Sequence, residues 1–315
     1  EAQGKIKGEI VLVPAANPVG LSQFLMGTHL GRFELNSGVN FNRQYPDLIA
    51  ALRENLAGKL GQDASQNIAL IRSQALALLD SLTPKGEMQA LKLELFRRAV
   101  DADIVLDLHC DYEAALHMYL GTPLWPDAAD LCAETGASVT LLAEDSGGTA
   151  FDEANSRIWW ELARAFPQHP IPPACLAATI EYRGERDVDE AQAERVASAL
   201  LGFLTGGGLI EAATGRPTVG RAVPATPLEG VATLEAPHAG VVIHHVAPGT
   251  LVRSGELIAE ILDPATGERS TLSARNSGVM FARRGHRYVT RGQWVAKIAG
   301  AEPLAWRQAG ALLSD

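Results

Sequence analysis

The stretch Ala102–Asp111, with the sequence ADIVLDLHCD, indicates the fold class more directly than any other part of the chain. Its apolar residues Ile104, Val105 and Leu106 form a short run that ends at a histidine between two acids. Such a run, entered from a helical pattern, predicts a buried strand of an α/β sheet. His109 then lies at the carboxyl end of the strand, where open α/β sheets place their ligand sites. A histidine there can be a metal ligand, a general base or a hydrogen-bonded core residue.

Composition narrows the function classes. The chain has 315 residues, 47% of them hydrophobic, and a formal net charge of -10. This length allows one large domain, or a larger and a smaller one. The acidic balance argues against a nucleic-acid partner. Three cysteines without a C-x-x-C pair predict reduced thiols in a cytoplasmic protein, and no apolar run is long enough to span a membrane.

A second strand carries an acid near its end. Leu176–Tyr182 is apolar except for Thr179 and Glu181. A carboxylate at the end of a buried strand is costly unless it is paired, hydrogen-bonded or close to a metal. Glu181 is therefore a candidate general base, and the alternative is an ion pair with Arg183 or Arg186.

The segments before these strands alternate between helix and loop. Glu9–Val13 predicts a buried strand, and Ala15–Leu48 a long loop that contains Asn42-Arg43. An arginine beside an asparagine suits the binding of a carboxylate. Apolar spacing predicts two amphipathic helices between Pro46 and Leu82, separated near Gly61, and a third over Glu87–Val100.

The composition changes near Gly208, which predicts an α/β domain over residues 1–208 and a β-rich domain over residues 209–315. The second part contains an internal repeat, residues 236–261 and 274–298. Each copy resembles half of a lipoyl- or biotinyl-type β-barrel, but neither has a lysine at the hairpin tip where such domains are modified. We therefore expect a smaller all-β, barrel-like domain without chemistry of its own.

Five features in order resemble the succinylglutamate desuccinylase/aspartoacylase family, which is related to the zinc carboxypeptidases. These are VPAANPVG after the first predicted strand, an Arg…Asn-Arg-x-Tyr-Pro element, the strand end Asp-Leu-His, the strand end Thr-x-Glu, and the β-rich C-terminal part. The resemblance runs from about Glu9 to Ala299. It implies a mixed-sheet, zinc-carboxypeptidase-like α/β domain followed by the smaller all-β domain.

The resemblance also implies roles for individual residues. His109 matches the family's third zinc ligand, and Glu181 the glutamate that activates the metal-bound water. Arg32 is similar to the arginine that polarises the scissile carbonyl. Asn42 and Arg43 match the pair that binds the substrate carboxylate. A further residue, Tyr288, lies where the family can contribute a substrate-contacting tyrosine.

One element of the family pattern is missing. The first two zinc ligands come from an H-G-x-E element placed before the first predicted strand, and the chain contains no H-x-x-E. We therefore expect the other two ligands upstream of residue 1, and one Zn²⁺ per chain in the full-length protein. A catalytic zinc normally has three protein ligands and an open position for water.

The implied function is zinc-dependent hydrolysis of a small N-acyl amino acid or related N-acyl amine. Glu181 would transfer the proton of a metal-activated water to the leaving amine, with Arg32 and zinc at the oxyanion. A carboxypeptidase-like peptidase and a non-catalytic binding module without zinc are the alternatives. The expected partner is a small-molecule substrate, without nucleic acid or membrane, and a homo-oligomer is compatible with the sequence. The acyl group and the amine stay open.

Overall fold

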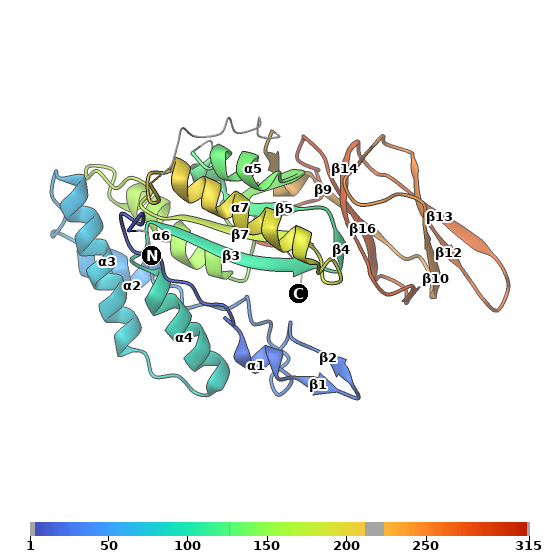
Figure 1. Ribbon diagram of the computed structural model, residues 1–315, viewed down its shortest axis with the longest axis horizontal. Helices are drawn as coiled ribbons and strands as arrows, with labels where there is room; N and C mark the ends of the chain where they lie inside the picture. Colours follow the sequence, from blue (N-terminus) through green and yellow to red (C-terminus); the bar gives the residue numbers. More distant parts are fainter. Residues whose placement is uncertain (1–3, 126, 212–223, 314–315) are drawn as a thin grey trace. The chain divides into compact units, whose positions relative to one another are not determined.

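The computed structural model describes residues 4–125, 127–211 and 224–313 (Figure 1). The chain divides into two compact units, which are interleaved in sequence. Unit 1 comprises Glu1–Glu9, Leu108–Ala143 and Thr179–Gln308, and unit 2 comprises Ile10–Asp107, Glu144–Ala178 and Ala309–Asp315. Each is described separately below. The predicted domain boundary after residue 208 stays a prediction, and residues 212–223, which follow it, lie outside the described residues.

A five-stranded sheet has the strand order β3-β7-β5-β6-β8, and from Leu108 and Thr179 onward β3 and β7 belong to unit 1. Its strands are β3 (Ile104–Asp111), β7 (Leu176–Gly184), β5 (His117–Gly121), β6 (Val139–Ala143) and β8 (Thr226–Pro227). Strand β6 pairs in parallel with both β5 and β8. The α/β class expected from the sequence is confirmed.

Two helices belong to unit 1 and pack against each other, α5 (Ala129–Thr135) and α7 (Glu190–Gly206). Local signals mark their ends. Helix α5 stops at Gly136, whose φ of 69° is the left-handed conformation that glycine adopts most easily. Helix α7 starts after Asp189, whose side chain accepts a hydrogen bond from the backbone nitrogen of Gln192.

Unit 2 is built from helices around one apolar core, which includes Leu52, Ile71, Phe96 and Trp159. The helices are α1 (Pro18–Leu21), α2 (Ile49–Leu56), α3 (Ala64–Ser81), α4 (Glu87–Ala99) and α6 (Phe151–Ala165). The expected break between two helices near Gly61 and the helix over Glu87–Val100 are confirmed. The long N-terminal loop contains only α1 and a small hairpin of β1 (Phe24–Leu25) and β2 (Thr28–His29).

The β-rich C-terminal part forms two antiparallel sheets in unit 1, with strand orders β13-β12-β10-β15 and β11-β14-β16-β9 (Figure 1). Strand β4 (Glu113–Ala114) adds to β14. The strands are β9 (Val231–Glu235), β10 (Gly240–His244), β11 (Thr250–Val252), β12 (Leu257–Leu262), β13 (Arg269–Ser273), β14 (Gly278–Arg283), β15 (Tyr288–Val289) and β16 (Trp294–Ala299).

The internal repeat explains this arrangement. Strands β10, β11 and β12 of the first copy correspond to β14, β15 and β16 of the second, and β9 and β13 come just before the respective copies. Apart from β9 and β13, each sheet takes two strands from one copy and one from the other. In the first copy β10 pairs with β12 and receives β15, whereas in the second β14 pairs with β16 and receives β11. The two copies thus exchange a short strand, which ties them together.

Two expectations about strands need correction. No strand forms over Glu9–Val13, and Ile10, Val11, Leu12 and Val13 are exposed. A β-branched run favours extended backbone, but a strand also needs a hydrogen-bonding neighbour, which local sequence cannot supply. Strand β3 forms as predicted but is not fully buried, because it ends the strand order of its sheet; Ile104 and Leu108 on it are exposed.

No helix among the described residues has both the length and the apolar character needed to cross a membrane.

Candidate functional site

His109 and Glu181 lie on neighbouring strands of unit 1. His109 is the third residue from the end of β3, and Glu181 is the fourth from the end of β7. Both side chains are partly buried. Strand β3 continues to Asp111, so His109 is inside the strand rather than beyond its end. The carboxyl ends of adjacent strands are where α/β sheets assemble ligand sites. The two residues singled out by the sequence are therefore brought to the same edge region of one sheet.

The backbone beyond the two strands is fixed by short hydrogen bonds. The nitrogen of Glu185 donates to the carbonyl oxygen of Asp111 at 2.7 Å, which joins the two strand ends. The nitrogen of Gly184 donates to Oδ2 of Asp187 at 3.0 Å. Just before these two donors, Arg183 adopts a φ of 62°, a left-handed conformation that is unfavourable for a residue with a side chain. Strand β7 thus contains a left-handed residue two positions after Glu181, and the chain turns after Gly184.

The surroundings of this strand end are acidic. Burial raises the pKa of the Cys110 thiol, and the carboxylates of Glu181, Glu185 and Asp111 raise it further. The thiol therefore stays protonated at neutral pH and is a poor nucleophile. The same negative potential favours a cation or a protonated group beside Glu181.

The alternative for Glu181, an ion pair with a following arginine, is not observed. In residues 4–125, 127–211 and 224–313, neither Arg183 nor Arg186 forms an ion pair. Both arginines are exposed.

The donor set for a catalytic zinc is incomplete. The part of the chain that the structure describes contains no cluster of three or more His, Cys, Asp or Glu side chains that could hold a metal ion. Three protein ligands are the usual requirement for catalytic zinc. The described residues therefore do not fit a complete zinc site. His109 is the zinc ligand that the family resemblance implies.

The second group of predicted residues lies in unit 2. Oδ1 of Asn42 accepts a hydrogen bond from the backbone nitrogen of Phe151 at 2.8 Å. Nη1 of Arg43 donates to the carbonyl oxygen of Asn42 at 2.6 Å. Because Oδ1 of Asn42 is an acceptor here, the amide nitrogen is the donor end of this side chain. The orientation of the amide is thus set by the protein.

A second loop, which contains Gly148 and Thr149, forms hydrogen bonds with the two residues that follow Arg43. The nitrogen of Gln44 donates to the carbonyl oxygen of Gly148 at 2.6 Å, and that of Tyr45 to Thr149 at 3.2 Å. The φ angles of Gln44, Gly148 and Thr149 are 58°, 77° and 51°, so all three of these residues are in the left-handed region. A Cβ added to Gly148 would lie 2.8 Å from Cδ of Arg43, so the arginine side chain passes directly over this glycine.

Lys92 is a residue of this region that the sequence interpretation missed. It lies on α4 and is only 4% exposed. Its Nζ donates to the carbonyl oxygen of Asn40 at 3.2 Å and to that of Arg43. The signal was present, because Lys92 falls on the buried helical stripe that continues with Phe96 and Ala99. A search for apolar periodicity skips a lysine at such a position.

The two remaining predicted residues, Arg32 and Tyr288, are exposed. Arg32 is an exposed residue of unit 2, with its guanidinium carbon 5.5 Å from the centre of the Phe33 ring. Its carbonyl oxygen accepts from the nitrogen of Phe41 at 3.1 Å, so its backbone is attached to the segment that leads to Asn42. Tyr288, in unit 1, is on β15 opposite Val241 and is 59% exposed. The roles assigned to them stay predictions.

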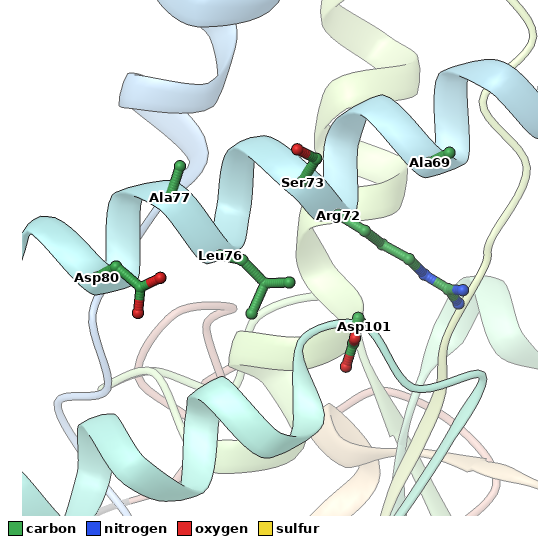
Figure 2. A pocket seen from close by; sticks show the side chains of 7 residues that line it. All are labelled: Ala69, Arg72, Ser73, Leu76, Ala77, Asp80 and Asp101. Carbon is green, nitrogen blue, oxygen red and sulfur yellow. The ribbon is translucent and has the colours of Figure 1, made fainter. Parts of the chain in front are cut away.

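A shallow hollow of about 570 Å³ lies elsewhere in unit 2 (Figure 2). Figure 2 shows side chains of one face of α3 with Asp101 opposite them; the residues that line it are Ala69, Arg72, Ser73, Leu76, Ala77, Asp80 and Asp101. Arg72 is engaged by Asp103 at 2.8 Å and by the carbonyl oxygens of Ala102 and Ala174. None of the residues predicted for the site lines this hollow. The contacts of Arg72 join α3 to the segments at Ala102 and Ala174, which is a structural role.

Comparison with known proteins links the chain to solved structures. No protein-family model and no curated protein matches it. A structure assigned as a succinylglutamate desuccinylase/aspartoacylase from Shewanella frigidimarina NCIMB 400 is 26% identical, with a TM-score of 0.81 over 95% of this chain and 82% of that one. A succinylglutamate desuccinylase/aspartoacylase family protein from Shewanella amazonensis SB2B is also 26% identical, with a TM-score of 0.77 over 90% and 79%.

A more distant structure has the same fold. The succinylglutamate desuccinylase/aspartoacylase from Rhodobacter sphaeroides is 19% identical, with a TM-score of 0.50 over 70% of this chain and 65% of that one. At this identity the similarity concerns the fold alone. The family that the sequence motifs resemble is thus the family of the two Shewanella structures, and the resemblance is confirmed.

Proposed function

We propose that this chain, which belongs to the succinylglutamate desuccinylase/aspartoacylase family, is a deacylase that hydrolyses the amide bond of a small N-acyl amino acid or related N-acyl amine. The observation that supports this most is the position of His109 and Glu181 on neighbouring strands, near their carboxyl ends. A carboxylate and an imidazole are groups that proton transfer and metal-assisted hydrolysis require. The similarity to deacylase-family structures agrees with this chemistry.

In the proposed reaction Glu181 removes a proton from the attacking water as its oxygen bonds to the acyl carbon. The same proton then passes to the amine nitrogen as the carbon–nitrogen bond breaks, so that one carboxylate acts first as base and then as acid. Arg32 would stabilise the negative charge on the acyl oxygen. Asn42 and Arg43 would bind the substrate carboxylate through the amide nitrogen and the guanidinium.

Zinc is part of the proposal for the full-length protein, with one ion per chain and His109 as one ligand. A bound zinc lowers the pKa of its water and polarises a carbonyl. We also propose that the α/β part is zinc-carboxypeptidase-like, that the repeat forms a barrel-like module, and that the protein acts in the cytoplasm. The thiols of Cys110, Cys132 and Cys175, none of which is in a disulfide, agree with the last point.

A substrate panel tests the function. The full-length product and the 315-residue chain are assayed side by side with N-acetyl and N-succinyl amino acids, the corresponding N-acyl amines and short peptides, and their zinc content is measured by elemental analysis. We expect the full-length product to contain about one zinc per chain and to hydrolyse N-acyl amino acids in preference to peptides. Hydrolysis of peptides alone would replace the deacylase by a peptidase. Absence of metal and of turnover in both would leave a binding protein.

A further inference from the structure

The feature that the proposed reaction does not use is the buried ammonium group of Lys92. Lysine is rarely buried without a partner, because the loss of hydration strongly disfavours the charge. Here burial lowers the pKa of Lys92 below its ordinary value. The ammonium nevertheless donates hydrogen bonds to the carbonyl oxygens of Asn40 and Arg43, and its nitrogen lies 5.7 Å from the centre of the Tyr45 ring. These contacts favour the charged form.

Among the residues that the structure describes, no carboxylate forms an ion pair with Lys92. The two carbonyl oxygens that accept from it take two of its three N–H hydrogens and carry no net charge. A buried cation without an ion-pair partner raises the local affinity for an anion. This is a different property from holding a loop together.

The position of the Lys92 ammonium indicates which anion it would attract. The two carbonyl acceptors bracket Asn42 in the sequence, so Lys92 fixes both sides of the turn that carries the carboxylate-binding pair. Asn40 itself is 5% exposed, and its Oδ1 accepts from the nitrogen of Asn42 at 2.9 Å. The backbone of the turn is therefore held by hydrogen bonds from Lys92 to Asn40 and Arg43. The residues that follow the turn are held by hydrogen bonds to the loop that contains Gly148.

We propose that Lys92 is a positioning residue that holds the Asn42–Arg43 turn and supplies a second positive charge to it, so that the site selects substrates with a free carboxylate. The inference rests on the proposed function and makes it narrower: N-acyl amino acids are substrates, and N-acyl amines that lack a carboxylate are poor ones. Loss of the turn and loss of the charge would both weaken binding of substrates that carry a carboxylate. A general destabilisation of the fold would affect both classes equally.

The first test measures anion binding and does not depend on turnover. Binding of succinate and of its uncharged analogue succinamide is followed by NMR in the wild type, in Lys92→Met and in Arg98→Met. Met matches the length of lysine and suits a buried position, whereas Arg98 is an exposed cation on the same helix and controls for the loss of one charge. We expect succinate to shift the amide signals of residues 40–45, and its Kd to rise at least about tenfold in Lys92→Met only.

Two outcomes of this test would overturn the inference. One is succinate binding that is equally tight in Lys92→Met and wild type, and the other is a failure of succinate to affect the turn at all. If Lys92→Met does not fold, the wild type still decides the question by a titration to alkaline pH. The buried Tyr45 phenol stays neutral there, because burial and the charge of Asp107 raise its pKa. Succinate binding should then weaken as Lys92 deprotonates, and constant affinity would exclude the role.

Kinetics separates this inference from the proposed function. For an N-acetyl amino acid, Lys92→Met should raise KM about tenfold or more with kcat changed by less than about threefold, and for the matching amide both values should stay as in the wild type. Equal losses for both substrates would indicate a merely structural role. Succinate binding that depends on Lys92, together with no hydrolysis of any N-acyl compound by the full-length protein, would exclude the deacylase and retain the anion site.

Discussion

The side-chain oxygen of Asn42 caps a helix that begins 109 residues later, through its 2.8 Å hydrogen bond from the nitrogen of Phe151. Helix α6 has alanine, Ala150, at its own N-cap, and that residue provides no side-chain hydrogen bond. A helix N-terminus leaves backbone N–H groups without intrahelical partners, and a polar side chain normally satisfies one of them. Asn42 does so from another segment, which ties a residue proposed to bind substrate to the fold of unit 2.

Substitutions of Asn42 should separate these two roles. Asn42→Ala removes the cap and should lower the free energy of unfolding by about 1 kcal/mol. Asn42→Asp keeps an acceptor and places a negative charge at a helix N-terminus, so stability should stay within about 0.5 kcal/mol of the wild type. Both variants should raise KM for an N-acyl amino acid, the aspartate more strongly because it repels the substrate carboxylate. Denaturant unfolding and steady-state kinetics measure the two effects, with exposed Asn36→Ala as control. Equal destabilisation by alanine and aspartate would contradict the capping role.

Gly148→Ala tests the contact beneath the Arg43 side chain. The added Cβ would meet Cδ of Arg43 at 2.8 Å, and the φ of 77° is strained for alanine. The strain should cost about 1 kcal/mol of stability, and the displaced guanidinium should raise KM about tenfold. Gly38→Ala is the matched control, because Gly38 has a φ of 69° and nothing within 4 Å of an added Cβ. It should show the same loss of stability without the change in KM. An unchanged KM in Gly148→Ala would show that Arg43 adapts or does not bind substrate.

The sequence predicts the long, periodic elements of this fold well and its non-local features poorly. Helix α3 is marked by apolar spacing and by Asp63, which accepts from the nitrogens of Ser65 and Gln66. By contrast, Glu9–Val13 has the composition of a strand but no strand forms there, because strand pairing depends on distant residues.

The candidate site shows the same division. His109 and Glu181 can be found from sequence because each ends an apolar run. Lys92 and the Gly148 loop cannot be found in that way, because what they contribute is contact with a turn about 50 and 105 residues earlier in the chain. Lys92 even contradicts the simple pattern, since a lysine within a helix is ordinarily assigned to the exposed face.

Acid should destabilise unit 1 through His117. This imidazole is fully buried, its Nδ1 lies 2.8 Å from the carbonyl oxygen of Ala115, and burial lowers its pKa to about 4. Between the unfolded-state pKa of 6.5 and about 4, the unfolded chain binds a proton that the folded chain does not. Stability therefore falls as the pH falls through this range. His244, whose pKa is also lowered to about 4, acts in the same direction.

A variant isolates the contribution of His117. His117→Asn keeps a donor near the position of Nδ1 but cannot take up a proton, so the free energy of unfolding should depend less on pH between 6.5 and 4.5, after a loss of about 1 to 2 kcal/mol at pH 7. Denaturant unfolding at successive pH values measures the slope. Exposed His286→Asn should retain the wild-type slope. Identical slopes in the wild type and His117→Asn would show that this histidine does not titrate on unfolding in that range.

Glu181→Gln tests the proposed chemistry most directly. Glutamine keeps the size and hydrogen-bonding shape of the side chain but cannot accept a proton, so turnover of an N-acyl amino acid by the full-length protein should fall about 10²- to 10⁴-fold, with zinc content and folding unchanged. Glu185→Gln is the matched control: Glu185 is an exposed carboxylate four residues further on that contributes to the same acidic environment of Cys110. A loss confined to Glu181→Gln would assign the proton transfer to Glu181. A similar, small loss in both variants would indicate a general electrostatic effect of the acidic strand end, and the base would have to be sought elsewhere.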